Sequence, residues 1–359
     1  MSDDTQSERQ TKARRVARAI DALKRGWSIG IDTGGQLLNL LPVETTNLDE
    51  YLKNQKSVSL LISPSRADSL KLLNQRAAAD PELPVQITLS APINAAEIIA
   101  IVDPVLDMKH PMKGPFQSAE LTNPQAAKAA MELARYGGLL PAFLIVDEPA
   151  EDRMNASDIS AFADSGALTI SAHARLPVAA NAQAHIYGFR SDADSTDHIG
   201  LVVGKRDSST PLVRLHSECL TGDVLGSLKC DCGPQLHSAL DQMSGTQWGL
   251  LLYLRQEGRG IGLINKLRAY ALQDQGFDTV DANQRLGFAI DARDFSIAAR
   301  MLELLNIPKV KLLTNNPEKV DGLERCGIKV EKRLSVKIAA NRHNEFYLDT
   351  KRDRTGHKL

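Results

Sequence analysis

Three cysteines, Cys219, Cys230 and Cys232, lie close together in the chain with the spacing C-x10-C-x-C. Clustered cysteines in a reducing compartment are more often metal ligands or catalytic groups than disulfides, and three thiolates suit zinc. A catalytic zinc has three protein ligands and an open position for water, whereas a structural zinc has four protein ligands. Because His216 and His237 could each supply a fourth ligand, the spacing is compatible with both kinds of site.

The residues before the first cysteine favour hydrolytic chemistry. Arg214, His216, Ser217 and Glu218 lead directly into Cys219. A structural zinc site has no need of an arginine and a glutamate beside its metal. A hydrolytic site does, because zinc lowers the pKa of its bound water towards neutrality and a neighbouring carboxylate can then accept the proton.

Longer motifs surround and follow these cysteines: RLHSECLTGD at residues 214–223, GSLKCDCG at 226–233, RQEGRGIG at 255–262, NKLRAYALQDQG at 265–276 and TNNP at 314–317. Together they resemble the GTP cyclohydrolase II family, and the similarity covers about residues 175–359. The resemblance implies a hydrolase acting on cyclic amidines that opens the imidazole ring of GTP at C8. It implies release of formate and diphosphate, with 2,5-diamino-6-(5-phosphoribosylamino)pyrimidin-4(3H)-one as the product, in the first step of riboflavin biosynthesis.

The same resemblance assigns roles to individual residues. It implies one Zn²⁺ per catalytic domain on the three cysteines, proton transfer by Tyr270, and attack on the α-phosphate by Arg293 with help from Asp291. An arginine nucleophile is unusual because its pKa exceeds about 12, so a purely electrostatic role for Arg293 stays open. The residues matched to GTP contacts are Arg214, Leu215, His216, Ser217, Glu218, Gln235, Glu257, Gly258, Arg259, Thr279, Thr314 and Lys319.

Simple chemistry supports some of these matches. Arg259 lies in a glycine-rich loop and can bind phosphate with two hydrogen bonds. Thr314 and Lys319 flank the start of a predicted helix, where backbone N–H groups favour anions. From the residues alone, Tyr270 is an ordinary tyrosine on the same helix face as Lys266. The family further implies Mg²⁺ on the triphosphate and a homodimer.

Chain length and composition indicate the number of domains and argue against nucleic-acid-binding and membrane proteins. A chain of 359 residues favours two domains. The 43 Lys and Arg nearly balance 44 Asp and Glu, and aromatic residues make up 4%. A zinc module for nucleic acid is therefore disfavoured, because such binders need basic stripes and stacking platforms. No apolar run approaches the roughly 18 residues of a membrane span, and residues 1–10 are polar, so we expect a cytoplasmic protein without membrane contact.

A third class of function is a zinc-containing regulatory or nucleotide-binding protein that has lost turnover. The discriminating feature is the set Tyr270, Asp291 and Arg293, because a relic that only binds should lose some of it. All three residues are present. The fourth cysteine, Cys326, lies far from the others in sequence and is expected to be a small buried hydrophobic residue.

Periodicity predicts an α/β (α+β) fold with two domains, 1–171 and 172–359, each with a mixed sheet and packed helices. In the second domain we expect strands at residues 200–203, 212–215, 248–254 and 309–313, and helices at 234–243, 263–275 and 295–305. Asn316 is a predicted helix N-cap before Pro317. Residues 174–197 show no strong period and are expected to form a linker or the start of the second domain.

The first domain is expected to contain helices at residues 9–25 and 126–136 and strands at 58–62, 85–89 and 142–146. It weakly resembles 3,4-dihydroxy-2-butanone 4-phosphate synthase, best over MELARYGGLLPA at residues 131–142. That family has an early acidic run and an Arg-x-Gly-His-Thr-Glu motif. Here only Asp32 remains of the acidic run, and the second region keeps Glu120 without a histidine. One carboxylate cannot hold Mg²⁺ well, so we expect a degenerate, inactive domain.

Overall fold

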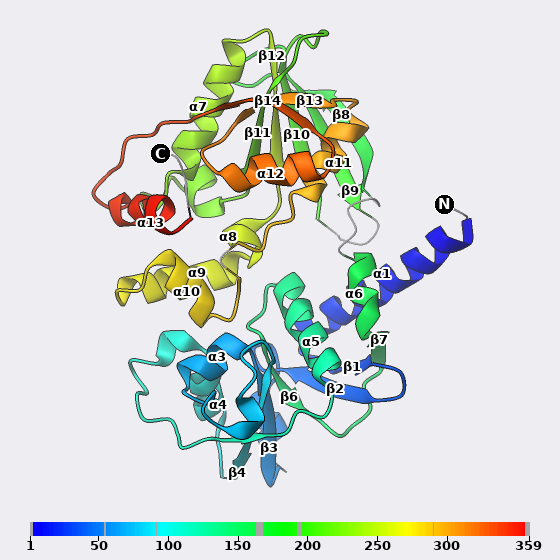
Figure 1. The fold of residues 1–359 in the computed structure, drawn as a ribbon, viewed down its shortest axis with the longest axis vertical. Helices are drawn as coiled ribbons and strands as arrows, with labels where there is room; N and C mark the ends of the chain where they lie inside the picture. Colours follow the sequence, from blue (N-terminus) through cyan, green and yellow to red (C-terminus); the bar gives the residue numbers. More distant parts are fainter. Residues whose placement is uncertain are drawn as a thin grey trace. The chain divides into compact units, whose positions relative to one another are not determined.

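The computed structural model describes residues 3–53, 55–90, 92–162, 168–191, 196–289 and 291–355. The chain forms two compact units, which Figure 1 shows as ribbons. Unit 1 comprises Met1–Asp164 together with Gly260–Ala292, and unit 2 comprises Ser165–Arg259 together with Arg293–Leu359. Each unit contains a mixed seven-stranded sheet with packed helices, which confirms the predicted fold class. The boundary between residues 171 and 172 stays a prediction.

The sheet of unit 1 has the order β5-β4-β3-β6-β2-β1-β7. Its neighbours are antiparallel except for the parallel pair β1 and β7. The strands are β1 (Ile29–Asp32), β2 (Leu37–Pro42), β3 (Ser57–Ile62), β4 (Val85–Ser90), β5 (Gln117–Ala119), β6 (Ala142–Ile145) and β7 (Asp152–Asn155). The central strands β3 and β6 bury most of their side chains, which agrees with the apolar residues that predicted strands at 58–62 and 142–146.

Helices cover both faces of this sheet. One face is covered by α1 (Asp3–Lys24), α5 (Pro124–Gly137) and the short α6 (Ile159–Phe162). Val16, Ile20 and Leu23, which share one face of α1 at helical spacing, are all buried against this sheet. The helix α5 extends one residue beyond the predicted end at 136 and is capped by Gly138, whose φ of 69° suits a glycine.

The other face of the unit 1 sheet is covered by helices from two distant parts of the chain. From the first part come α2 (Leu48–Leu52), α3 (Pro64–Ser69) and α4 (Ala95–Val102). From the second come α9 (Leu263–Asp274) and α10 (Thr279–Arg285). Ala269, Leu272, Ala282 and Leu286 belong to the same buried cluster as Leu60 of β3 and its neighbours. The segment Gly260–Ala292 therefore completes the core of unit 1.

The sheet of unit 2 has the order β14-β13-β11-β12-β10-β9-β8. The four strands from β14 to β12 are mutually parallel, and β10, β9 and β8 continue the sheet antiparallel. The strands are β8 (Leu168–Arg175), β9 (His185–Ser191), β10 (His198–Gly204), β11 (Leu212–Ser217), β12 (Trp248–Leu254), β13 (Lys309–Leu313) and β14 (Lys329–Leu334).

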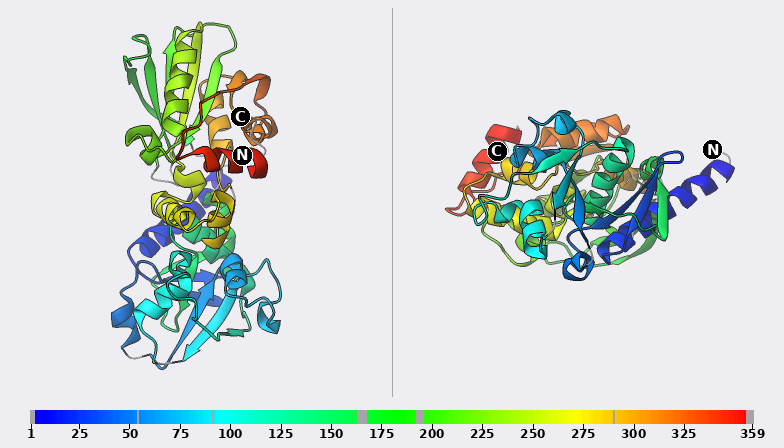
Figure 2. Two further views of the ribbon diagram at one scale, coloured as in Figure 1. Left: turned by 90° about the vertical axis from the view of Figure 1, so that its left-hand side faces the viewer. Right: turned by 90° about the horizontal axis from the view of Figure 1, so that it is seen from below.

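The helices of unit 2 lie on both faces of its sheet. On one face α7 (Cys232–Ser244) buries Ala239 and Met243 against β10 and β12, and the left view of Figure 2 shows it running along the strands. On the other face lie α11 (Ser296–Leu304) and α12 (Pro317–Arg325). The helix α12 begins as predicted, because the Asn316 side chain accepts from the N–H of Glu318. The remaining helices are the single turn α8 (Glu257–Gly260) and α13 (Glu345–Thr355).

Of the two expectations for residues 174–197, a linker or the start of the second domain, the structure supports the second, because these residues belong to unit 2. The stretch contains the end of β8 and all of β9, which pair antiparallel and are joined by the loop at residues 176–184, while residues 192–195 lie outside the described part. The strand β8 buries only Leu168, and β9 buries only Phe189. Because almost every side chain of these strands reaches solvent, the sequence carries no alternation of apolar and polar residues. Within the described residues, no helix is long and apolar enough to cross a membrane.

Candidate active site

The three clustered cysteines lie between the end of β11 and the start of α7. The chain leaves β11 at Ser217, reaches Cys219, and then makes a short π-helical turn. Cys230 and Cys232 follow at the start of α7. The three Sγ atoms all lie within 4.8 Å of one another, and those of Cys219 and Cys230 are 3.7 Å apart. The structure therefore brings the predicted metal ligands together.

Gly222 shapes the floor of this cysteine cluster. Its N–H donates to the Sγ of Cys219 at 3.3 Å. A Cβ atom at this position would lie 2.7 Å from the Sγ of Cys230, 3.0 Å from the Sγ of Cys219 and 3.0 Å from the Cβ of Cys232. Only glycine leaves room here for three sulfurs, so the turn is packed around the thiols.

The cluster fits a zinc ion. A tetrahedral zinc with Zn–S bonds of about 2.3 Å places its sulfurs about 3.8 Å apart, close to the 3.7 Å observed between Cys219 and Cys230. Among the described residues, no His, Asp or Glu side chain joins the three cysteines as a fourth ligand. His216 instead bonds Asp223, and His237 is exposed. The arrangement matches the three-ligand pattern of catalytic zinc sites.

The environment of Cys230 favours the protonated thiol when no metal is bound. The pKa of the Cys230 thiol is raised, chiefly by its hydrogen bond with Cys219. Cys219 and Cys230 are both almost fully buried. Since zinc binds thiolates, loading this site must release protons.

Asp223 organises the loop that carries the first cysteine. Its side chain is 3% exposed and accepts from the backbone N–H of Cys219 at 3.0 Å and the hydroxyl of Tyr253 at 2.9 Å. The Nε2 of His216 lies 3.0 Å from the same carboxylate, and the rings of His216 and Tyr253 are stacked. Burial and the neighbouring Asp223 raise the pKa of Tyr253, so its hydroxyl stays a donor.

Sequence reasoning missed the roles of Asp223, Gly222 and Tyr253. The first two lie inside the motif at residues 214–223, which was the available signal. Nothing in that motif shows that one carboxylate would receive three donors from separate elements.

Burial lowers the pKa of His216 despite the opposing effect of Asp223, so the neutral ring is favoured in the folded protein.

Arg214 links the sheet to the start of α7. It is 5% exposed, and its guanidinium donates to the side-chain oxygen of Gln235 at 2.5 Å and to the carbonyl of Leu313 at 3.4 Å. Gln235 in turn donates to Asp231 at 2.5 Å. Burial lowers the pKa of Arg214 to about 10, which still leaves it cationic at neutral pH. The predicted pair Arg214 and Gln235 is therefore one connected group beside the cysteines.

Two further predicted cations lie at the ends of β11 and β13. The ammonium of Lys319, on the first turn of α12, donates to the carbonyl of Leu215 at 2.7 Å. Arg293 donates to the hydroxyl of Ser217 at 3.3 Å. Thr314 is buried, and its hydroxyl accepts from the N–H of Asn316 at 3.1 Å. These side chains follow the carboxyl ends of parallel strands, which is where open α/β sheets bind ligands.

The loop after β12 carries the next predicted residues. Glu257 accepts from the backbone N–H of Leu220 at 2.7 Å, which ties this loop to the cysteine turn. Glu218 pairs with Arg255 at 2.8 Å. Gly258 and Arg259 have φ of 63° and 61°. A left-handed arginine is uncommon, and such strain is often found at binding sites.

The remaining predicted residues, Tyr270, Thr279 and Asp291, belong to unit 1. Tyr270 is half-buried on α9, and the ammonium of Lys266 lies 5.7 Å from its ring centre, which agrees with the shared helix face. Thr279 is the first residue of α10, and its hydroxyl accepts from Gln273 at 3.0 Å. Their roles towards GTP stay predictions.

Comparison with known proteins gives matches over both halves. The family profile of GTP cyclohydrolase II matches residues 169–335. GTP cyclohydrolase-2 of Azospirillum brasilense is 38% identical over 367 residues, which cover 96% of this chain and 94% of that protein. GTP cyclohydrolase-2 of Enterobacter sp. (strain 638) is 56% identical over 173 residues, covering 48% of this chain and 88% of that protein.

Two further matches come from multidomain proteins. The riboflavin biosynthesis protein RibBA of Bacillus subtilis (strain 168) is 52% identical over 176 residues, which cover 48% of this chain and 44% of that protein. A crystal structure of RibBX, a two-domain 3,4-dihydroxy-2-butanone 4-phosphate synthase from A. baumannii, covers 90% of this chain at 16% identity with a TM-score of 0.29.

Proposed function

Because the chain belongs to the GTP cyclohydrolase II family, we propose that it hydrolyses GTP in riboflavin biosynthesis at a zinc site formed by Cys219, Cys230 and Cys232. The observation that carries the proposal is the packed cluster of three thiols without a fourth protein ligand among the described residues. The reaction opens the imidazole ring at C8 and releases formate and diphosphate. Zinc, when bound there, supplies a water molecule whose pKa is lowered towards neutrality.

The residues around the thiols keep this site in shape. Asp223 holds the backbone N–H of Cys219 and the hydroxyl of Tyr253, so it fixes both the first ligand and the adjacent wall. Arg214 and Gln235 connect β11 to the start of α7, where the other two ligands lie. A site fixed in this way needs little reorganisation when the substrate reacts.

The triphosphate is bound by cations at the ends of the parallel strands. Arg293 and Lys319 are held by Ser217 and Leu215 of β11, and Arg259 lies in the left-handed turn after β12. Positioned cations stabilise the charge that develops when a phosphoryl bond breaks. A Mg²⁺ ion on the triphosphate completes this set in our proposal, with Asp291 beside Arg293 in sequence and Tyr270 as the proton donor at the ring.

One assay tests the proposal directly. Purified protein with Zn²⁺, Mg²⁺ and GTP should release formate and diphosphate. Cys230→Ser should abolish formate release, whereas Cys326→Ser, which changes a half-buried cysteine outside the cluster, should retain it. Absence of formate from folded, zinc-loaded wild-type protein would refute the assignment.

The nature of the phosphate step needs its own variants. Arg293→Ala should lose diphosphate release if the guanidinium attacks or stabilises the α-phosphate, and Arg293→Lys separates the two, because lysine keeps the charge without the guanidinium. Full diphosphate release by Arg293→Ala would exclude the residue from this step. Gel filtration tests the homodimer that the family implies.

For residues 1–164 we propose a domain without synthase activity. The side chain of Asp32 accepts from the N–H of Gly35 at 2.8 Å, and Asn123 bonds the hydroxyl of Thr33 at 2.8 Å, so this region is used for turn structure. Among the described residues, the cysteine cluster is the one group of three or more His, Cys, Asp or Glu side chains placed to hold a metal. Formation of 3,4-dihydroxy-2-butanone 4-phosphate from ribulose 5-phosphate by the purified protein would overturn this proposal.

A further inference from the structure

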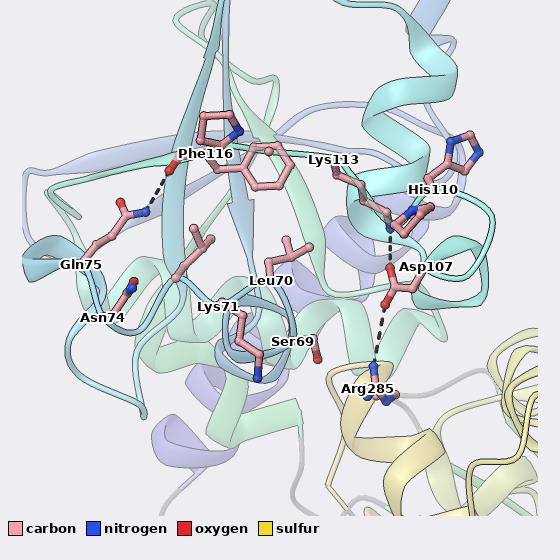
Figure 3. A pocket seen from close by; sticks show the side chains of 14 residues that line it. Ser69, Leu70, Lys71, Asn74, Gln75, Asp107, His110, Lys113, Phe116 and Arg285 are labelled. Carbon is pink, nitrogen blue, oxygen red and sulfur yellow. Dashed lines mark hydrogen bonds and ion pairs between the residues drawn. The ribbon is translucent and has the colours of Figure 1, made fainter.

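We propose that a cationic pocket in unit 1, between the end of α3 and the loop before β5, binds a small phosphate monoester, and that α10 takes part in this binding. The pocket has a volume of about 470 Å³, within the range of about 300–1,000 Å³ that holds small molecules. Its charged lining consists of Lys71, Lys113, Arg285 and Asp107. Figure 3 shows these side chains around the pocket.

Asp107, the single carboxylate of the lining, forms an ion pair with Arg66, which lies outside the lining. Arg66, whose side chain is 4% exposed, makes two hydrogen bonds to Asp107 at 2.8 and 2.7 Å. Burial alone would raise the pKa of Asp107, but the bonds from Arg66 and Lys113 outweigh it and hold the pKa below its ordinary value. Asp107 therefore acts as an anchor for cations and leaves the pocket with a net positive charge.

Two of the lining cations have donors to spare. Among the described residues, the ammonium of Lys71 makes no ion pair and the guanidinium of Arg285 makes no hydrogen bond within 3.5 Å. Arg285 approaches Asp107 at 3.8 Å and stacks on Phe277 at 4.1 Å, which fixes its plane while its N–H groups stay available. In Figure 3 Arg285 rises from α10 and Lys113 descends from the opposite side, and both point towards Asp107.

Lys113 provides the fixed part of the site. Its side chain is only 8% exposed, and its ammonium bonds the carboxylate of Asp107 and the carbonyl of Ala100. Two partners use two of its three N–H groups, and one is left over. A buried ammonium beside two cations is costly unless an anion adds to the single carboxylate, so the site is short of negative charge.

The charge and the wall chemistry together indicate the ligand class. With Arg66 counted beside the three lining cations, four cations against one carboxylate leave three positive charges. A phosphate monoester carries about 1.5 to 2 negative charges at neutral pH and would offset most of this excess. A phosphate group fills only part of about 470 Å³. The rest of the lining includes Leu70, Phe116 and Asn74, which suit a compact organic group with an apolar face and a hydrogen-bonding edge.

The loop that carries Phe116 is held rigidly. The side chain of Gln75 donates to the carbonyl of Phe116 at 2.8 Å and accepts from the N–H of Ser118 at 2.7 Å, as Figure 3 shows for the first of these bonds. A wall fixed before binding lowers the entropy cost of binding. Neither Asp32 nor Glu120, the two acidic residues kept from the synthase motifs, lines the pocket.

Because α10 supplies Arg285, a ligand in the pocket would also affect how easily α10 opens. Arg285 is the last residue of α10, which packs with α9, the helix that carries Tyr270. A ligand bridging Lys113 and Arg285 would tie α10 to the loop before β5 within unit 1. Occupancy of the pocket should therefore slow the local opening of the α9–α10 segment.

The test uses the full chain without GTP and measures binding of glycerol 3-phosphate, phenyl phosphate and inorganic phosphate by calorimetry. We expect saturable binding of the monoesters, tighter than that of inorganic phosphate. Arg285→Gln and Lys71→Gln should each weaken it at least tenfold, with partial rescue by Arg285→Lys. Arg300→Gln is the matched control, because Arg285 and Arg300 are equally exposed at 35% and Arg300 lies in unit 2.

Each other outcome overturns a stated part of the proposal. If neither monoester binds saturably, or if both glutamine variants bind like wild type, the pocket is not a phosphate site. Equal affinity for inorganic phosphate would overturn the role of Phe116 and its neighbours. Loss of binding in Arg293→Ala would place the ligand at the GTP phosphate site instead. Finally, hydrogen exchange at residues 279–285 should slow on binding, and unchanged exchange would refute the part played by α10.

Discussion

Adding a single methyl group at Gly222 should weaken zinc binding without touching any ligand. In Gly222→Ala the new Cβ would lie 2.7 Å from the Sγ of Cys230 and 3.0 Å from that of Cys219. Restoring an ordinary contact of about 3.5 Å requires the sulfurs to move by about 0.8 and 0.5 Å. Metal–ligand distances tolerate only about 0.2 Å, so both thiolates cannot keep their places.

The size of the effect follows from the cost of overpacking, which is typically about 1–3 kcal/mol. If this cost falls on the zinc-bound state, zinc affinity drops by about 5- to 150-fold. Competition with a chromogenic chelator measures the zinc dissociation constant directly, and urea unfolding of the chelator-treated protein shows whether the metal-free fold is changed.

Gly245→Ala is the matched control for this substitution. Gly245 caps α7 with φ of −80°, which alanine adopts freely, and a Cβ there would meet only the carbonyl oxygens of Gln242 and Asp241, at 3.5 and 3.8 Å. This variant should bind zinc as wild type does. If Gly222→Ala also binds zinc within about twofold of wild type, the idea that this turn is packed around the metal is wrong.

Three further outcomes follow from buried polar groups. Asp223→Asn should destabilise the protein by about 1–3 kcal/mol in urea unfolding, because one amide oxygen can still accept from Cys219 and Tyr253, but the NH2 group that replaces the other oxygen cannot accept from Nε2 of His216; an unchanged midpoint would contradict this. Asp107→Asn leaves Arg66 without its buried partner and should cost about 3 kcal/mol, measured in the same way. Because burial lowers the pKa of His216, stability that depends on its neutral ring is complete above about pH 6.5 and is lost as the pH falls below it. His216→Gln should therefore flatten the dependence of unfolding free energy on pH between about pH 5 and 6.5, and an unaltered slope would argue against this assignment.

Two central strands of unit 2 were predictable from the sequence. The structure gives β12 as Trp248–Leu254 and β13 as Lys309–Leu313, with the same bounds as the predicted strands. The strand β12 is an almost unbroken apolar run, whereas β13 alternates exposed lysines with the buried Val310 and Leu312. The edge strands β8 and β9 were not predictable, because a strand with one buried side chain has no periodic pattern.

Some residues of the candidate site were also predictable from the sequence, and others were not. The three cysteines were predictable, because their spacing and chemistry point to one metal. The central role of Asp223 was not, because its donors come from a turn and from a strand 30 residues further along. Nor could periodicity show that α9 and α10 share a core with Leu60 and its neighbours, because an apolar helix face does not specify the surface that covers it.

The discontinuous composition of unit 1 also bears on how the chain is synthesised. The core of unit 1 includes Phe288, yet its first segment ends at Asp164. A ribosome adding about 5–20 residues per second needs about 6–25 s for the intervening stretch. During that time the apolar surface destined for α9 and α10 is uncovered on a nascent chain. Unit 1 must therefore wait for most of unit 2 to emerge, which makes this interval the one in which a chaperone would matter most.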